Sequence, residues 1–145
     1  MANAPPADRN GRLDLASHIS VRGVALSRTP SQACLSSGFG PRRRGRRHEG
    51  VALYTGRPAP VAAAAAGEVS FVGRLRGYGL TVDVRHGRGV VTRYAHLSRV
   101  GVDPGARLKS GARIGLTGST GNATAVHLHY EIRVDGRPIN PLAGP

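Results

Sequence analysis

The sequence is poor in the residues that form aromatic cores and covalent cross-links. Its 145 residues include no Trp, two Phe, four Tyr and one Cys. The single cysteine, Cys34, excludes an internal disulfide framework and a cysteine-based zinc site. A chain of this length can bury roughly 68–70% of its unfolded surface and needs no cross-link merely to fold. The core must therefore be built from Val, Leu, Ile and Ala.

Long hydrophobic runs are also missing. The longest uninterrupted apolar run is Val61–Ala66, which is far shorter than the roughly 20 residues that a membrane-spanning helix needs. The first thirty residues contain charges and prolines but no apolar stretch long enough for the core of a signal peptide. We therefore expect no transmembrane segment, and no signal peptide is visible.

Negative charge is scarce. The chain has 21 Lys and Arg against 8 Asp and Glu, for a net charge of +13, and Lys109 is its only lysine. This balance favours acidic partners such as nucleic acid, anionic lipid or an anionic cell-wall polymer, although a coding bias toward Arg explains it equally well. The arginine run at 42–47 is typical of a solvated loop and is a hypothetical contact for wall polymer. Few aromatic residues are available to stack on bases, so we expect no specific nucleic-acid partner.

Turn-forming residues divide the chain into short segments. With 21 Gly and 10 Pro, the sequence favours an all-β domain of short, mostly antiparallel strands. Residues 1–33 are expected to be a flexible N-terminal tail, in which a weak apolar alternation from Ile19 to Leu26 could add an edge strand. Residues 34–145 are expected to form one domain. The run at 62–66 is interpreted as extended, and the predicted strands are Val51–Leu53, Val69–Val72, Leu80–Arg85, Val90–Tyr94, Arg113–Leu116 and Val126–Val134.

Histidines are the clearest candidates for chemistry. His127 and His129 lie two residues apart within a predicted strand, so their side chains share one face. Two imidazoles on one face suit metal binding, or one metal ligand beside one proton-transfer group. For an isolated His-x-His pair, two surface histidines would be the more ordinary explanation. His48 and His96 carry no functional signal by themselves.

Taken together, the motifs are much more specific. The stretch from Ser36 to Pro141 resembles the lysostaphin/LytM family of zinc metalloendopeptidases, which hydrolyse peptide cross-bridges in bacterial peptidoglycan. The matching pieces occur in family order and are Ser37-Gly38-Phe39-Gly40, His48-Glu49-Gly50-Val51, Pro60-Val61, Gly77-Tyr78-Gly79, His86-Gly87, Thr92-Arg93-Tyr94-Ala95-His96-Leu97, Gly118-Ser119-Thr120-Gly121, His127-Leu128-His129-Tyr130-Glu131 and Asn140-Pro141.

This resemblance implies a fold and a site. The implied fold is an antiparallel β-sandwich-like groove, a duplicated hybrid motif with zinc on its floor, in a LytM-type metallopeptidase-like domain spanning 34–145. His48 and His129 match the family's zinc ligands. His96 and His127 match its two catalytic histidines, which orient the attacking water and stabilise the oxyanion. The resemblance also implies peptidoglycan as partner and an extracytoplasmic or cell-wall location.

One departure puts the activity in doubt. The third ligand of the family, an Asp, falls on Ala52, and the usual Gly-Pro before the His-x-His motif is Ala125-Val126. A catalytic zinc site usually has three protein ligands and an open position, so weak or partial zinc occupancy is expected. Glu49 is expected to point to the opposite face of its strand from His48, and the sequence does not show which way Asp83 faces.

Two functions follow from this pattern. The first is a peptidoglycan-directed zinc metalloendopeptidase with a weakened or rearranged site. The alternative is a catalytically degenerate domain, a pseudoenzyme, that binds peptidoglycan or activates a partner wall hydrolase.

Overall fold

Short antiparallel strands joined by tight turns make up the part of the chain that the structure describes. The computed structural model describes residues 18–27, 30–31, 34–37, 39–41, 47–123 and 125–142, and none of them lies in a helix. The order of the main path through the ten-stranded sheet is β11 (Arg107–Leu108), β8 (Gly67–Leu75), β9 (Gly79–Gly87), β10 (Val90–Val100), β13 (His127–Val134), β6 (Val51–Tyr54) and β3 (Cys34–Ser37).

The remaining strands extend this sheet or form small hairpins. β12 (Arg113–Thr117) pairs with both β10 and β7 (Pro60–Ala62), and β14 (Arg137–Ile139) pairs with β13. Two separate two-stranded sheets are formed by β1 (His18–Val21) with β2 (Val24–Ser27), and by β4 (Gly40–Pro41) with β5 (Arg47–His48). Every strand pair is antiparallel.

The predicted fold class is confirmed. All six predicted strands are present, and several are longer than predicted. β10, for example, continues past Tyr94 to Val100. The run at 62–66 was expected to be extended, but β7 ends at Ala62 and a bend follows. No helix long and apolar enough to cross a membrane occurs among the described residues. Most of the arginine run, residues 42–46, lies outside them.

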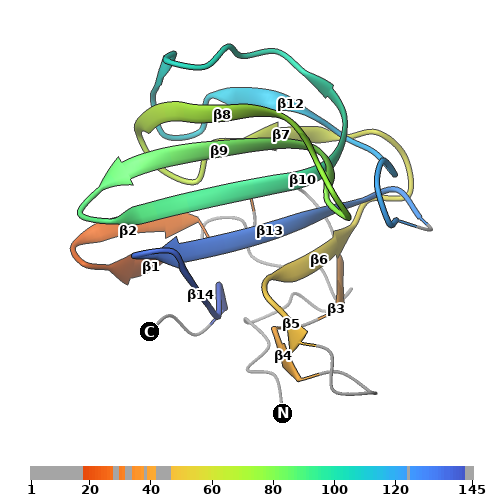
Figure 1. Cartoon of the computed structure of the whole chain (residues 1–145), viewed down its shortest axis with the longest axis horizontal. Helices are drawn as coiled ribbons and strands as arrows, with labels where there is room; N and C mark the ends of the chain where they lie inside the picture. The colour runs from red at the N-terminus through yellow and green to blue at the C-terminus, as the bar shows by residue number, and fades with distance from the viewer. Residues whose placement is uncertain are drawn as a thin grey trace.

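Alternation along the central strands separates a core from a polar face. The long strands β8, β9, β10 and β13 run side by side across the centre of Figure 1. Successive side chains of a strand point to opposite faces of the sheet, and here one set is fully buried: Val82, Val84, Tyr94, Leu128, Tyr130 and Ile132. The other face of β13 carries His127, His129, Glu131 and Arg133. The polar face is therefore the one that can hold a functional site.

The β1–β2 hairpin closes the apolar side of the sheet. Ile19, Val21 and Leu26 are buried in the same core cluster as the central strands. The Tyr130 hydroxyl donates a hydrogen bond of 2.7 Å to the carbonyl of Ser27. These residues lie within the segment predicted to be a flexible tail, and the apolar alternation there forms a hairpin of its own and not an added edge strand. The division at residue 33 stays a prediction.

Three hairpin turns meet at one end of the molecule and hold this hairpin in place. Each turn pairs a residue of positive φ with a following Gly: Arg22-Gly23, Arg88-Gly89 and Asp135-Gly136. Such pairs are typical of type I′ turns. Arg22 forms a bidentate pair with Asp135, at 2.6 and 3.1 Å, and each of Arg22 and Arg88 donates to the other's carbonyl at 2.8 Å.

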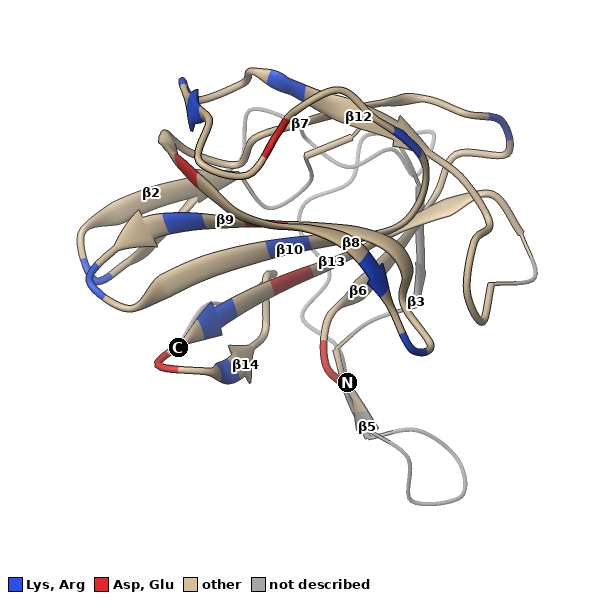
Figure 2. Cartoon of the chain, turned by 45° about the horizontal axis from the view of Figure 1, so that its top comes forward, with Lys and Arg blue, Asp and Glu red and all other residues tan. Residues whose placement is uncertain are grey.

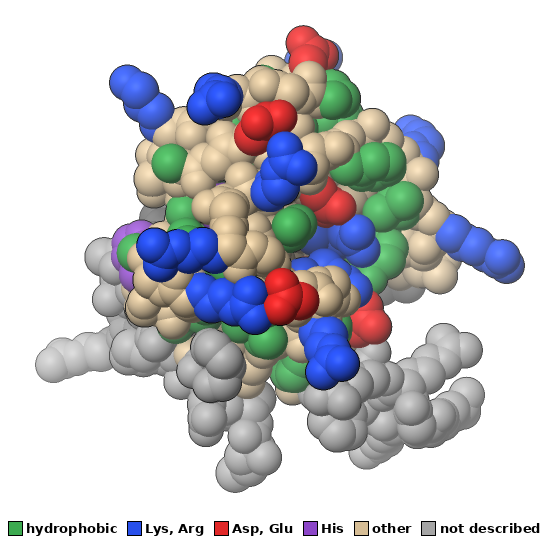
Figure 3. Space-filling model, turned by 60° about the vertical axis from the view of Figure 1, so that its left-hand side comes forward, with side chains coloured by type: hydrophobic (Ala, Val, Ile, Leu, Met, Phe, Trp, Pro, Cys, Tyr) green, Lys and Arg blue, Asp and Glu red, His purple; other side chains and the backbone are tan. Residues whose placement is uncertain are grey.

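Figure 3 shows several Lys and Arg side chains, with fewer Asp and Glu, on one face of the molecule.

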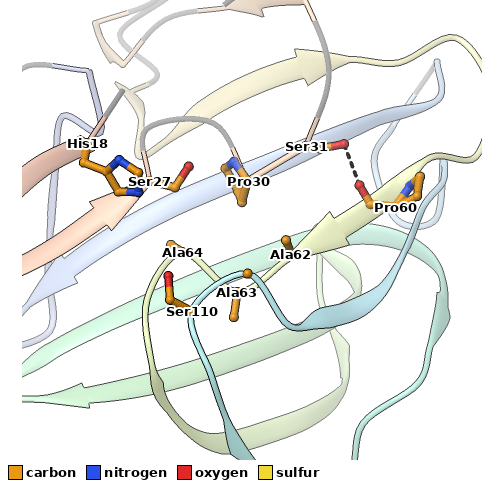
Figure 4. Close-up of a pocket in the computed structure, with 10 residues that line it drawn as sticks. His18, Ser27, Pro30, Ser31, Pro60, Ala62, Ala63, Ala64 and Ser110 are labelled. Carbon is orange, nitrogen blue, oxygen red and sulfur yellow. Dashed lines mark hydrogen bonds between the residues drawn. The ribbon is translucent and has the colours of Figure 1, made fainter. Parts of the chain in front are cut away.

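A hollow lies beside the β1–β2 hairpin. It has a volume of about 360 Å³ and is lined by small side chains of β7 and the following bend, together with His18, Ser27 and Ser31. Figure 4 shows Ser31 donating a hydrogen bond of 2.9 Å to the carbonyl of Pro60 at its rim. None of the described residues that line it is His48, His96, His127 or His129.

A chain of four hydrogen bonds stabilises the bend after β7. His86 Nδ1 lies 2.8 Å from the carbonyl of Ala66, so it must be the protonated ring nitrogen. In a neutral ring Nε2 then accepts from the Thr92 hydroxyl at 2.7 Å, and Thr92 accepts in turn from Tyr94 at 2.7 Å. The backbone N–H of Ala64 donates to the Tyr94 oxygen at 2.9 Å. With a neutral His86, all four hydrogen bonds therefore have one donor and one acceptor.

Protonation of His86 would break this chain. A charged ring must donate from Nε2, so the Thr92 hydroxyl must turn its own proton away from His86 and can no longer donate to it. Burial lowers the pKa of His86, and the hydrogen bond to Ala66 opposes that shift only in part.

We therefore expect the protein to lose stability as the pH falls below about 6.5, the ordinary pKa of His in an unfolded chain. The folded pKa of His86 is the lower one, so the unfolded state takes up the proton first. Its contribution is complete above about pH 7.5 and falls by up to about 1.4 kcal/mol per pH unit until the folded pKa is reached. Urea denaturation of wild type and His86→Gln between pH 7.5 and 5 measures it. Parallel pH profiles of the two proteins would contradict this assignment.

Candidate active site

Four histidines from separate parts of the chain come together on the polar face. The ring centroids of His48 and His129 are 4.9 Å apart, and those of His96 and His127 are 4.8 Å apart. His96 also contacts His129, with 5.9 Å between centroids. The residues that the sequence analysis selected therefore form one cluster. Their roles as ligands or catalytic groups stay predictions.

Hydrogen bonds define the protonation of His129. Its Nε2 lies 2.7 Å from Oε2 of Glu131, and its Nδ1 lies 3.1 Å from Nε2 of His48. A carboxylate only accepts, so the proton of a neutral His129 ring is on Nε2. Nδ1 then presents a lone pair to His48.

His96 reaches the cluster through an irregular backbone. It has a φ of 59°, the left-handed region that non-glycine residues rarely adopt, within a bulge between Tyr94 and Leu97 where the register with β9 shifts. Backbone strain of this kind, on the order of 1–3 kcal/mol, is typical of functional sites. Its N–H donates to the Tyr78 carbonyl at 2.8 Å. Burial, reinforced by the nearby His127 and His129 rings, lowers the pKa of His96 to about 4.

His96 and His127 are held in the same way. His96 Nδ1 lies 2.7 Å from the carbonyl of Thr120, and His127 Nδ1 lies 2.8 Å from the carbonyl of Ala125. Because a carbonyl only accepts, each Nδ1 carries the proton and each neutral ring keeps an unprotonated Nε2. These two imidazoles can therefore accept a proton at Nε2, as a general base must.

The donor set at the cluster fits zinc only in part. Two nitrogens bound to one tetrahedral zinc at about 2.0–2.1 Å are about 3.3 Å apart, and the His48 and His129 nitrogens are 3.1 Å apart. Ala52 lies directly opposite His129 in the β6–β13 register, and its side chain is a methyl group with no donor atom. Among the described residues no group of three or more His, Cys, Asp or Glu side chains could hold a metal ion. The His48–His129 nitrogen pair is present, and no third protein ligand is found among the described residues.

The two carboxylates considered as replacements are engaged elsewhere. Glu49 was expected on the opposite face from His48, but the segment after His48 is not regular strand. The Glu49 carboxylate lies on the polar face, where it accepts from Tyr78 at 3.1 Å and from Arg133 at 3.4 Å. Asp83 also lies on this face, in a bidentate pair with Arg93 at 2.9 and 3.0 Å.

Several polar residues that surround the histidines were not selected from the sequence. Tyr78 contacts the His129 ring edge-on, with 5.5 Å between centroids, and the Arg93 guanidinium lies 5.0 Å from the centre of the Tyr78 ring. Burial, followed by the charges of nearby carboxylates, raises the pKa of Tyr78, so it remains a hydroxyl donor. Glu131 and Arg133 follow His129 at the two-residue spacing of a strand, and that spacing could have identified them.

Comparison with known proteins agrees with this geometry. The sequence profile of Peptidase family M23 matches residues 46–141. The DD-carboxypeptidase/endopeptidase Mpg of Neisseria meningitidis serogroup B is 45% identical over 98 residues, which cover 68% of this chain and 23% of that protein. The chain therefore spans about a quarter of the length of this curated relative.

Solved structures give the same result. A zinc-containing peptidase from Vibrio cholerae superposes with a TM-score of 0.76 at 32% identity, covering 83% of this chain and 40% of that one. The catalytic domain of lysostaphin from Staphylococcus simulans superposes with a TM-score of 0.71 at 30% identity, covering 75% of this chain and 89% of that one.

The antiparallel sheet and the matches to lysostaphin and to other M23 peptidases confirm the resemblance to the lysostaphin/LytM class seen in the sequence. The chain belongs to Peptidase family M23.

The Asp83–Arg93 pair should be important for stability. Its side chains are 12% and 18% exposed. Replacement of Arg93 by Ala leaves a largely buried carboxylate without its partner, and we expect a loss of roughly 1–3 kcal/mol, less than a fully buried pair loses.

Arg85→Ala is the matched control on the neighbouring strand. Its pair with Glu68 is 3.5 Å long, with side chains 59% and 38% exposed, and such pairs contribute less than about 1 kcal/mol. Chemical denaturation of both variants measures the difference. Equal losses would contradict the importance of the Asp83–Arg93 pair.

Proposed function

We propose that this domain acts on the peptide cross-bridges of peptidoglycan and that its hydrolytic rate is low because position 52 supplies no zinc ligand. The observation that carries the proposal is the cluster itself, with a His48 nitrogen 3.1 Å from a His129 nitrogen and the His96–His127 pair beside it. The family membership supports the same chemistry.

Each histidine has a distinct part in this proposal. His48 and His129 would hold zinc, which when bound supplies an acidified water and polarises a carbonyl. His96 and His127 accept a proton at Nε2 and, once protonated, donate a hydrogen bond to the oxyanion that develops on the substrate carbonyl. The groove would position the peptide against these two rings.

A second candidate function is a catalytically degenerate domain that binds peptidoglycan or activates a partner wall hydrolase. Its support is the donor set, because no third His, Cys, Asp or Glu side chain completes a metal group within the described ranges. Both candidates place the protein outside the cytoplasm, at the cell wall. An anionic wall polymer is the further partner that the positive charge favours.

Restoring an aspartate at position 52 tests the proposal. Opposed residues of an antiparallel pair have Cβ atoms about 4.5–5.5 Å apart, so a carboxylate at 52 reaches the site beside His129. We expect the wild-type protein to carry substoichiometric zinc. Ala52→Asp should raise zinc affinity by more than the 10–100-fold that outer-sphere groups contribute, and cleavage of muropeptides should rise with it. Metal analysis and chromatography of the digests are the measurements.

Ala52→Asn is the matched control, because its side chain has the size of Asp without the charge. It should give much less zinc and much less cleavage than Ala52→Asp. A wild-type protein that already holds one tight zinc per chain, and cleaves as fast as Ala52→Asp, would refute the claim of a missing ligand. If Ala52→Asp binds zinc but neither protein cleaves muropeptides, the degenerate function is favoured.

A further inference from the structure

Glu131 is a fully buried carboxylate next to the histidine cluster. Its side chain has 0% exposure, and it lies two residues after His129 on the same face of β13. Figure 2 shows this strand with an acidic segment followed by a basic one, and these are Glu131 and Arg133, the only charged residues of β13. Burial of a carboxylate is costly unless its oxygens are paired, so the partners of Glu131 are informative.

Both oxygens of Glu131 have separate partners. Oε2 accepts from His129 Nε2 at 2.7 Å, and Oε1 accepts from Arg133 at 2.5 Å. Arg133 is itself fixed, since it also donates to Glu49 at 3.4 Å and to the Gly136 carbonyl at 2.9 Å. Burial of an ionised carboxyl needs a compensating charge, and the Arg133 guanidinium on Oε1 supplies it through a charge-assisted hydrogen bond. Glu131 is therefore an ionised acceptor in a fixed orientation.

We propose that Glu131, oriented by Arg133, is a positioning residue that holds His129 in the Nε2–H tautomer and so presents the bare Nδ1 to the site. The neutral His129 ring has one proton, and a carboxylate at Nε2 determines where it is. Carboxylates that hold ligand histidines in this way raise ligand basicity and typically change metal affinity 10–100-fold. The metal part of this inference rests on the proposed function, whereas the tautomer part does not.

A purely structural ion pair between Glu131 and Arg133 would make a different prediction. In Glu131→Gln, Arg133 can only donate, so it should bind the amide oxygen and turn the amide NH₂ toward His129. His129 Nε2 would then have to accept, and its proton would move to Nδ1. A structural role alone gives no reason for this reversal of the tautomer.

The test is the tautomer of His129 in metal-free protein, read from ¹⁵N–¹H correlations of the imidazole nitrogens. In the wild type we expect a proton on Nε2 and none on Nδ1, and the reverse in Glu131→Gln. In Glu131→Gln with Arg133→Met the amide is free to turn, and the wild-type tautomer should return. Glu49→Gln, which changes another partner of Arg133 without touching His129, should leave the tautomer unchanged.

The outcomes that overturn the proposal are specific. A wild-type His129 with its proton on Nδ1 would refute it directly, and this measurement needs no variant to fold. An unchanged tautomer in a folded Glu131→Gln would refute it as well.

Zinc affinity gives the second readout. In the Ala52→Asp background, Glu131→Gln should weaken zinc binding about 10–100-fold, while Glu49→Gln should leave it unchanged. Equal affinities of the two double variants would refute the metal part. If Ala52→Asp itself fails to bind zinc, the proposed function fails, and the tautomer measurement still decides the role of Glu131.

Discussion

The pairing of β13 with β10 on one side and β6 on the other determines most of what this protein can do. Leu128, Tyr130 and Ile132 are fully buried and hold the strand in register. A slip of one residue would exchange the two faces of a strand, so the same packing that stabilises the core also directs His127 and His129 to the polar face. The register further places Ala52 and Ala95 on either side of His129. Both neighbours have only a methyl side chain, so neither supplies a polar atom to the imidazole.

Charge around the histidines is balanced before any ligand arrives. The whole chain has 8 acidic residues, and three of them, Glu49, Asp83 and Glu131, lie on the polar face near the cluster. All three are paired with Arg93 or Arg133. These carboxylates therefore have little remaining charge to offset a dication, and Ala52, opposite His129, adds no anionic side chain. Both features support the proposal that zinc binds weakly here.

The sequence predicted the fold class, six of the strands and the residues of the cluster. Regular alternation put His127 and His129 on one face of a strand, whereas His48 and His96 were selected only through the family resemblance. The failures are at irregular backbone. The left-handed His96 and the turn of Glu49 toward Tyr78 depend on a bulge and a bend that no local pattern marks. The alternation at 19–26 was noted but interpreted as a possible edge strand, because nothing local shows that it forms a hairpin packed on the core. Tyr78 reaches His129 by tertiary packing alone.

The covering hairpin has a practical consequence for how the protein is divided. The family match begins at residue 46, yet Ile19, Val21 and Leu26 complete the core beneath the central strands, and Arg22 joins the hairpin to the turn at Asp135. A fragment excised at the start of the match would leave the back of the sheet open to water, and an exposed apolar sheet invites aggregation. We therefore expect the smallest fragment that folds by itself to be longer than the region matched by the family.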